Sequence, residues 1–318
     1  MWWVKFFAIR LVRLVLTLLV ASFIIFCALE LAPGSPLAAL SGGRTLSPEA
    51  VATLTARYHL DDPFLVRYFT WLGGVVQGDL GVSIGKRQDV SEIIVGRAWA
   101  SVTLVLMASL IIIVIGVGLG IASGLRDRSS NVMTLAATAV MAAIPAFVGA
   151  TVLLMVFSAT LGWFPALGTG DGTFGDLVWH LVLPAVALSI ASIAVVARVT
   201  RAAIREELGT EHVQTAVSRG IPYPAIVRRH VVRNAGISIV TVSGLTVASL
   251  IAIAAVVETA FSTNGLGSYL VQAAAAKDLA MVQGISLVFV TVFVLMNVAI
   301  DVITALIDPR TRVAGGVG

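Results

Sequence analysis

The chain has 318 residues, of which 58% are apolar and only 12% are charged, and its formal net charge is +4. Soluble domains carry charge at about a quarter of their positions, so this composition excludes an ordinary soluble domain and indicates several membrane spans. The positive charge does not indicate nucleic-acid binding, because the arginines cluster beside apolar stretches and not on a polar face. The single cysteine, Cys27, lies inside the first apolar stretch, so no disulfide can form within the chain.

Six stretches are long and apolar enough to cross about 30 Å of hydrocarbon, which takes about 20 helical residues. They lie near residues 9–31, 101–124, 132–161, 181–197, 237–257 and 285–307. The first is too long for a signal peptide and no small-residue cleavage site follows it, so we expect a retained helix. The sequence therefore predicts an all-α membrane protein with six transmembrane helices.

The predicted organisation follows from these stretches. It consists of an N-terminal helix (1–31), a large structured external segment (32–100), a five-helix core (101–307) with a cytoplasmic loop at 198–236, and a tail (308–318).

Basic residues predict the orientation, because Lys and Arg close to the ends of spans resist translocation. With the N-terminus inside, the cytoplasmic loops collect most of the arginines, whereas the two short external loops hold only Lys277. The other basic residues lie in segment 32–100, which exceeds the length over which the rule applies. We therefore expect a multi-pass protein of the cytoplasmic (inner) membrane with both termini in the cytoplasm.

The external segment contains two helix starts. Ser47 and Asp62 each precede a proline, the order typical of an N-cap followed by the first helical position. Apolar residues after Asp62 recur at helical spacing and predict an amphipathic helix, either on the outer membrane surface or against the bundle. Such a helix could cap the helix ends or contact an external partner. The glycine-rich stretches 40–44 and 81–87 look like nucleotide-binding loops, but no apolar strand precedes them and we expect neither to bind nucleotide.

Four of the six predicted spans contain no charged residue. An ion-coupled transporter usually needs buried carboxylates, and only Glu30, Glu258 and Asp301 come near, each towards a span end. The four histidines lack the spacing of metal ligands, so we expect neither a metal site nor a catalytic site. A source of energy outside the spans is therefore favoured.

Small residues and one proline mark the second and third spans. Gly116, Gly120 and Gly124 form a ridge at four-residue spacing, and Pro145 interrupts the third span. Close helix packing is the favoured interpretation of both features, with a hinge at Pro145 as the alternative for the proline.

The polar break at 198–236 predicts a helix-turn-helix. The fourth span continues to Leu208, Thr210 caps a short helix, and Gly220 adopts the left-handed conformation that ends it. Val213, Ala216 and Val217 share one face of this short helix. We expect that face to insert into a groove on a cytoplasmic partner; the alternative is that it packs on its own bundle.

The residues of this loop resemble a known family. Gln214-Thr215-Ala216, three residues, Gly220 and then the run from His230 to Ala235 are similar to the coupling loop of ABC importer permeases. The general family motif begins Glu-Ala-Ala, and the departures here match the B-type permease of dipeptide, oligopeptide and nickel importers. The resemblance covers nearly the whole chain, with further landmarks at 31–34, 60–63, 78–81, 161–165, 258–262, 265–267 and 308–310.

The resemblance implies a type I permease that works by alternating access and moves di- or oligopeptides. Its implied partners are a second homologous permease, two cytoplasmic ATPase domains that carry ATP and magnesium, an external solute-binding protein and membrane lipid. The implied coupling helix, which docks the ATPases, comprises Glu211, Val213, Gln214, Thr215, Ala216, Val217, Arg219 and Gly220. By analogy, the contact for the substrate or its binding protein comprises Glu258, Phe261, Asn264, Gly265 and Gly267.

Three alternatives remain open at this point. The same architecture serves importers of nickel chelates or glutathione-like solutes. An ion-coupled secondary transporter would work without ATPase partners and would depend on carboxylates such as Asp301. A structural scaffold would tolerate changes across residues 215–220.

Overall fold

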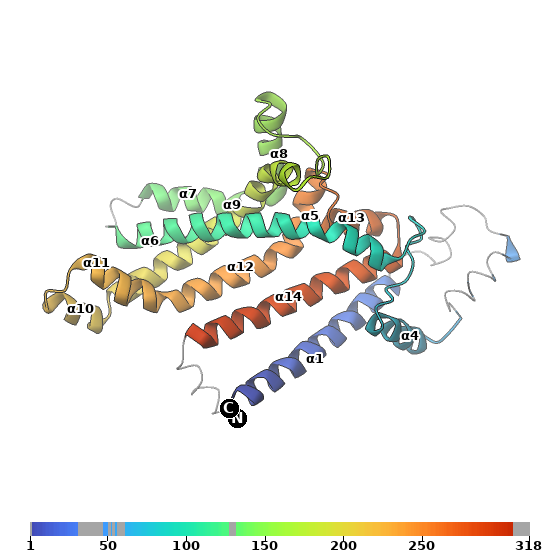
Figure 1. Cartoon of the computed structure of the whole chain (residues 1–318), viewed down its shortest axis with the longest axis horizontal. Coiled ribbons are helices and arrows are strands. Elements are labelled where there is room, and N and C mark those ends of the chain that lie inside the picture. The colour runs from blue at the N-terminus through green and yellow to red at the C-terminus, as the bar shows by residue number, and fades with distance from the viewer. Residues whose placement is uncertain are drawn as a thin grey trace. The chain divides into compact units, whose positions relative to one another are not determined.

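The computed structural model describes residues 2–30, 47–49, 52, 55, 61–126 and 132–307 (Figure 1). Over these ranges every long element is a helix, and the extended backbone forms only the isolated antiparallel bridge Val82–Asp89. The prediction of an all-α fold is confirmed. The chain divides into two compact units, one built from Trp3–Trp99 with Gly265–Val294 and the other from Ala100–Asn264 with the C-terminal residues.

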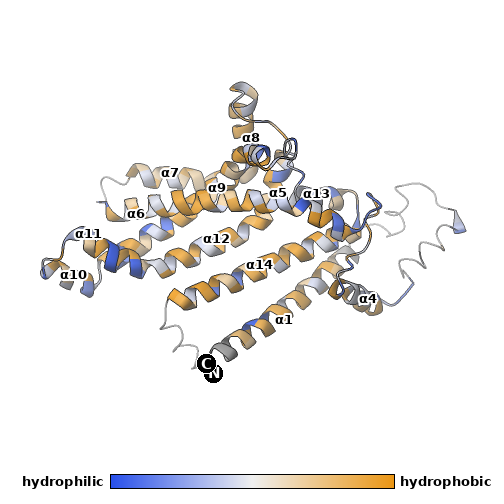
Figure 2. Ribbon diagram, viewed as in Figure 1, coloured by the Kyte–Doolittle hydropathy of each residue, from blue (hydrophilic) through white to orange (hydrophobic). Residues whose placement is uncertain are grey.

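The long helices match a membrane protein in length and composition. Five spans qualify, namely Phe7–Ala28, Val90–Leu125, Phe174–Leu208, Tyr223–Ala260 and Leu279–Ile307, and the bent pair Val132–Ala143 with Ala146–Thr160 supplies a sixth if it counts as one span. Figure 2 shows apolar residues along these helices and polar residues gathered on the short helix α10 and on the turn that follows α11. Several spans are longer than predicted, because helices continue past the apolar stretch into polar sequence.

The larger unit contains α6 (Gly118–Leu125), α7 (Val132–Ala143), α8 (Ala146–Leu153), α9 (Phe174–Leu208) and α12 (Val232–Ala260), together with the later part of α5 (Val90–Ile111). Helix α9 contacts α6, α7, α8 and α12. Its 35 residues would extend roughly 50 Å at 1.5 Å per residue, well beyond the thickness of the hydrocarbon. The predicted continuation of the fourth span to Leu208 is therefore confirmed.

The glycine ridge lies where α6 and the preceding π-helical turn (Ile112–Val117) meet α9. A Cβ atom on Gly120 would lie 2.4 Å from the Cβ of Thr200 and 2.8 Å from the carbonyl oxygen of Ala197. One on Gly124 would lie 2.7 Å from the Cγ2 of Ile204. Only residues without a side chain permit this approach, so the close-packing interpretation of the ridge is confirmed.

Pro145 breaks the third span. Helix α7 ends at Ala143, α8 begins at Ala146, and the two segments are bent by 99°. Proline has no backbone N–H and disfavours the helical conformation in the residue before it, so Ile144 already lies outside the helix. The third span, predicted over 132–161 with an interruption at Pro145, is therefore present as a bent pair of helical segments. Whether this bend moves stays a prediction.

The smaller unit contains α1 (Trp2–Glu30), α4 (Phe64–Val76), α13 (Leu266–Ala275) and the first part of α14 (Leu279–Ile307). Helix α4 begins at Phe64 with Pro63 at its N-cap, one position later than the predicted start with Asp62 at the N-cap and Pro63 as the first helical residue. Its Tyr68 packs edge-on against Phe23 and Phe26 of α1. The Tyr68 hydroxyl lies 3.0 Å from the Ser22 hydroxyl. The amphipathic helix therefore lies against α1, while Phe69 on its other side is exposed. The stretch 40–44 lies outside the described residues.

We expect Gly120→Ala to destabilise the larger unit by about 1–3 kcal/mol, because the new methyl group overpacks the contact with Thr200. Gly118→Ala is the matched control, since a Cβ there meets nothing within 4 Å. Thermal unfolding of the two variants in the same detergent measures the difference. Equal midpoints would contradict the close approach of α6 to α9.

Candidate functional site

The candidate site is the loop that joins α9 to α12. After α9 ends at Leu208, the chain forms α10 (Glu211–Ser218), α11 (Tyr223–Ile226) and a π-helical turn (Val227–Val231) that continues into α12. The predicted helix-turn-helix is therefore present, and the whole loop belongs to the larger unit.

The start of α10 differs in detail from the prediction. Thr210 occupies the N-cap with extended backbone, as expected, but its side chain does not cap the helix. Its hydroxyl instead donates a 2.6 Å hydrogen bond to the carbonyl of Glu207 in the last turn of α9. The backbone carbonyl of Thr210 accepts the first hydrogen bonds of α10, from Val213 and Gln214. Thr210 thus ties the two helices together.

The end of α10 is a Schellman turn. Gly220 has φ +73°, and its N–H donates to the carbonyl of Val217 at 2.9 Å. The N–H of Ile221 donates to the carbonyl of Ala216 at 3.2 Å. These two hydrogen bonds provide donors for carbonyl groups in the last turn of α10. Their geometry requires the left-handed conformation at the residue that Gly220 occupies. The predicted conformation of Gly220 is confirmed.

Val213 and Ala216 point inwards and not towards a partner. They are only 3% and 5% exposed, and they pack in a cluster with Ile204 of α9 and with Ile226 and other residues of the returning chain. The prediction that Val213, Ala216 and Val217 form one partner-facing face is therefore wrong for the first two residues. Helical spacing identified an apolar face correctly, but this chain itself covers it.

Polar side chains hold the base of the loop. The Asn234 amide donates to Glu207 Oε1 at 2.8 Å, and His212 Nε2 lies 2.8 Å from the same oxygen. These three residues come from α12, α9 and α10, so one carboxylate joins the helix that enters the loop, the short helix and the helix that leaves it. Asn234 belongs to the run from 230 to 235 that resembles the family motif, but its contact with Glu207 was not predicted, because residues 27 positions apart give no local pattern.

The outer surface of the loop carries the other predicted residues. Glu211, Gln214, Thr215, Val217, Arg219 and Gly220 are all exposed. Val217 is 57% exposed, and two apolar residues beyond the turn, Ile221 (37%) and Tyr223 (53%), are exposed as well. Ile221 and Tyr223 were not predicted, although apolar residues directly after a helix-ending glycine in a polar loop were a usable signal.

The predicted external contact residues are mostly buried. Glu258 is 1% exposed and accepts a 2.6 Å hydrogen bond from the Ser101 hydroxyl, while Phe261 is 2% exposed in the core of the larger unit. Gly265 and Gly267 are buried where α13 begins. Asn264 alone among the five is exposed, with φ +50°. In this structure a direct contact with substrate is therefore open to Asn264 and not to the other four.

Metal ligation is not indicated by the described residues, among which no three His, Cys, Asp or Glu side chains converge. The phosphate-loop-like stretch 81–87 forms a turn between the paired residues Val82 and Asp89. Its Ser83 hydroxyl and Gly85 N–H both donate to the carboxylate of Asp278. These donors therefore serve an internal contact.

The fold defines a class, the all-helical membrane proteins with several spans. Family models sharpen it: "binding-protein-dependent transport system inner membrane component" matches residues 116–313, and the model for the N-terminal part of such components matches residues 3–108. The chain belongs to this family, the permease subunits of ABC importers.

Similar proteins cover almost the whole chain. A putative peptide transport system permease protein of Brucella abortus (strain 2308) is 36% identical over 308 residues, covering 95% of this chain and 97% of the relative. The oligopeptide transport system permease protein OppB of Salmonella typhimurium is 34% identical over 312 residues, covering 97% and 99%.

Solved structures support the fold. Two inward-facing crystal forms of the methionine ABC transporter MetNI match with TM-scores of 0.54 and 0.56 at 17% and 19% identity. Each match covers 68% of this chain and 96% of the solved chain. The type I permease fold expected from the sequence is therefore confirmed.

We expect Gly220→Val to open the Schellman turn, because a β-branched residue is strained at positive φ by at least about 1–2 kcal/mol. Hydrogen exchange of the Ile221 amide should become roughly tenfold faster. Gly220→Asn is the matched control, since asparagine tolerates the left-handed region. Slow exchange in the valine variant would show that the turn does not depend on glycine.

Proposed function

We propose that this chain is one permease subunit of an ATP-driven importer that moves di- or oligopeptides across the inner membrane by alternating access. The peptide assignment is supported by the relatives from Brucella and Salmonella, whose names refer to peptide and oligopeptide transport. The scarcity of charge in the spans supports an energy source outside them, because an ion relay needs buried ionisable groups.

The loop between α9 and α12 is the proposed docking site for the ATPases. One observation supports the docking proposal above all. The inner face of α10 is already covered by this chain, whereas the apolar side chains of Val217, Ile221 and Tyr223 are exposed. Helix α9 is longer than a bilayer is thick, so these residues extend past the hydrocarbon, where lipid tails cannot cover them. An aromatic and two aliphatic side chains on a rigid base are suited to a protein pocket.

The proposed assembly has several further parts. A second homologous permease, in a heterodimer, completes the translocation path, and an external solute-binding protein delivers the substrate. ATP and magnesium bind to the two ATPase domains and not to this chain. In this arrangement both termini and the coupling loop are cytoplasmic, and the exposed Asn264 lies on the outer side, where it is available to the binding protein or its cargo.

We expect Val217→Asp to lower ATPase co-purification and peptide uptake at least tenfold, because a buried unpaired charge costs more than about 1.4 kcal/mol at an interface. The loop itself should keep slow exchange at the Ile221 amide, since Val217 is exposed in the chain alone.

Ala216→Asp is the informative comparison for that experiment. Ala216 is buried, so an aspartate there disrupts the packing under α10. The variant should therefore show fast exchange of the Ile221 amide as well as loss of peptide uptake. Normal uptake by Val217→Asp would contradict docking through this surface.

We expect uptake in proteoliposomes, reconstituted with the partner subunits and the binding protein, to require ATP and to persist when ionophores collapse the ion gradients. Radiolabelled peptide accumulation measures both conditions. Uptake without ATP that stops on addition of ionophore would replace this proposal with an ion-coupled mechanism.

A further inference from the structure

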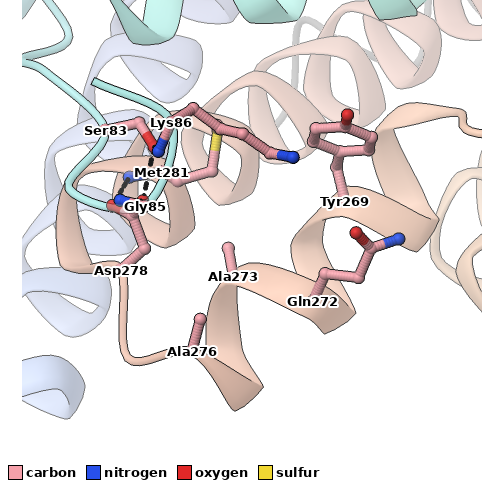
Figure 3. Close-up of a pocket in the computed structure, with 9 residues that line it drawn as sticks. All are labelled: Ser83, Gly85, Lys86, Tyr269, Gln272, Ala273, Ala276, Asp278 and Met281. Carbon is pink, nitrogen blue, oxygen red and sulfur yellow. Dashed lines mark hydrogen bonds between the residues drawn. The ribbon is translucent and has the colours of Figure 1, made fainter. Parts of the chain in front are cut away.

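The smaller unit contains a cavity of about 220 Å³ that the proposed transport cycle does not use. It lies between the turn that precedes α5 and the segment from α13 to the start of α14 (Figure 3). Side chains around it include Lys86, Tyr269, Gln272, Ala273, Asp278 and Met281. The volume is below the range of about 300–1,000 Å³ that is usual for drug-sized ligands, so it suits a group the size of one residue.

A buried carboxylate fixes the shape of this cavity. Asp278 is 5% exposed, and its Oδ2 accepts hydrogen bonds from the Ser83 hydroxyl at 2.5 Å and from the Gly85 N–H at 3.1 Å. Its Oδ1 accepts from the Met281 N–H at 3.3 Å. Both oxygens are therefore engaged, and the turn that carries Lys86 is held against α14 before any ligand arrives.

Two cations meet at one aromatic ring beside the cavity. The Lys86 ammonium lies 5.7 Å from the centroid of the Tyr269 ring, and the Arg97 guanidinium carbon lies 4.7 Å from it. Neither cation forms an ion pair with a residue in the described ranges. Like charges gathered at one ring repel each other, and an anion between or beside them would relieve that repulsion.

The remaining surface of the cavity is mixed in character. The Gln272 amide provides hydrogen-bond donors, as Figure 3 shows it beside Tyr269, whereas Ala273, Ala276 and Met281 provide an apolar wall. A cation with an amide matches the oxygens of a carboxylate, and the apolar wall matches a small aliphatic body attached to it. A free inorganic anion would leave that wall without a partner.

We propose that this pocket binds the carboxylate end of a peptide, with Lys86 as the principal charged contact, Gln272 as a second donor and Tyr269 as a wall. The identity of this ligand rests on the proposed peptide transport. The pocket holds one terminal residue and leaves the rest of the peptide outside, so it discriminates by the terminal group and not by length.

The test uses the full chain in nanodiscs of phosphatidylcholine. The probes are N-acetyl-dialanine and its C-terminal amide, and binding is followed by saturation-transfer NMR. We expect the acid to bind at least about tenfold more tightly than the amide, because a charge-assisted hydrogen bond is lost in the amide. Equal affinities for the two probes would overturn the proposal.

Variants locate the binding. Lys86→Gln should weaken binding of the acid about tenfold, whereas Arg87→Gln should not change it, since Arg87 is exposed in the next position and does not line the cavity. Thermal unfolding of both variants checks that the fold is kept. An unchanged affinity in Lys86→Gln would overturn the assignment.

A last arm separates peptide from lipid. Replacing phosphatidylcholine by phosphatidylglycerol should leave the affinity of the acid unchanged. If phosphatidylglycerol instead abolishes binding of the acid, and does so only when Lys86 is present, the pocket would be assigned to an anionic lipid headgroup. ATP-dependent uptake is measured separately in proteoliposomes. ATP-dependent uptake that does not discriminate between acid and amide would contradict the pocket proposal alone. Uptake that does not require ATP would contradict the proposed function alone.

Discussion

The close approach of α6 to α9 is the contact on which the larger unit depends. Between two apolar helices in lipid there is no hydrophobic gain, so association comes from van der Waals packing at short range. The glycines at 116, 120 and 124 remove the side chains that would keep α6 and the π-helical turn before it away from Val196, Thr200 and Ile204. Because α9 also contacts α7, α8 and α12, this single approach fixes the helix around which the unit is assembled.

The loop between α9 and α12 takes its rigidity from α9. The last turns of that helix supply Ile204 to the apolar cluster under α10 and Glu207 to the polar contacts with His212 and Asn234. The Schellman turn at Gly220 then fixes the far end of α10. A force applied to the exposed tip therefore acts on α9 directly, as the proposed docking site requires, because no loosely held segment lies between them.

Local features of the fold could be predicted from the sequence, and long-range ones could not. The conformation of Gly220 and, to within one residue, the start of α4 were predictable because their signals lie within a few residues. The 99° bend at Pro145 was not, since proline marks an interruption without giving its angle. The pair Ser83 and Asp278 is separated by 195 residues and has no local signature.

The orientation of α10 shows a different limit of prediction. Its apolar positions were identified, but periodicity specifies only that a face is buried and not which protein buries it. Val213 and Ala216 proved to be covered by their own chain, which leaves Val217 on the outer side. The residues beyond the turn, Ile221 and Tyr223, fall outside the helical period and so escaped the same reasoning.

Helix α12 is tied to its neighbours by polar contacts near both ends. Asn234 bonds to Glu207 of α9 at one end, and Glu258 accepts from Ser101 of α5 at the other. The bond to Glu258, which is 1% exposed, is costly to leave unmade, whereas the bond of the exposed Asn234 can be replaced by water at lower cost. The alternating access proposed for this chain therefore has to move the Glu258 end of α12 together with α5.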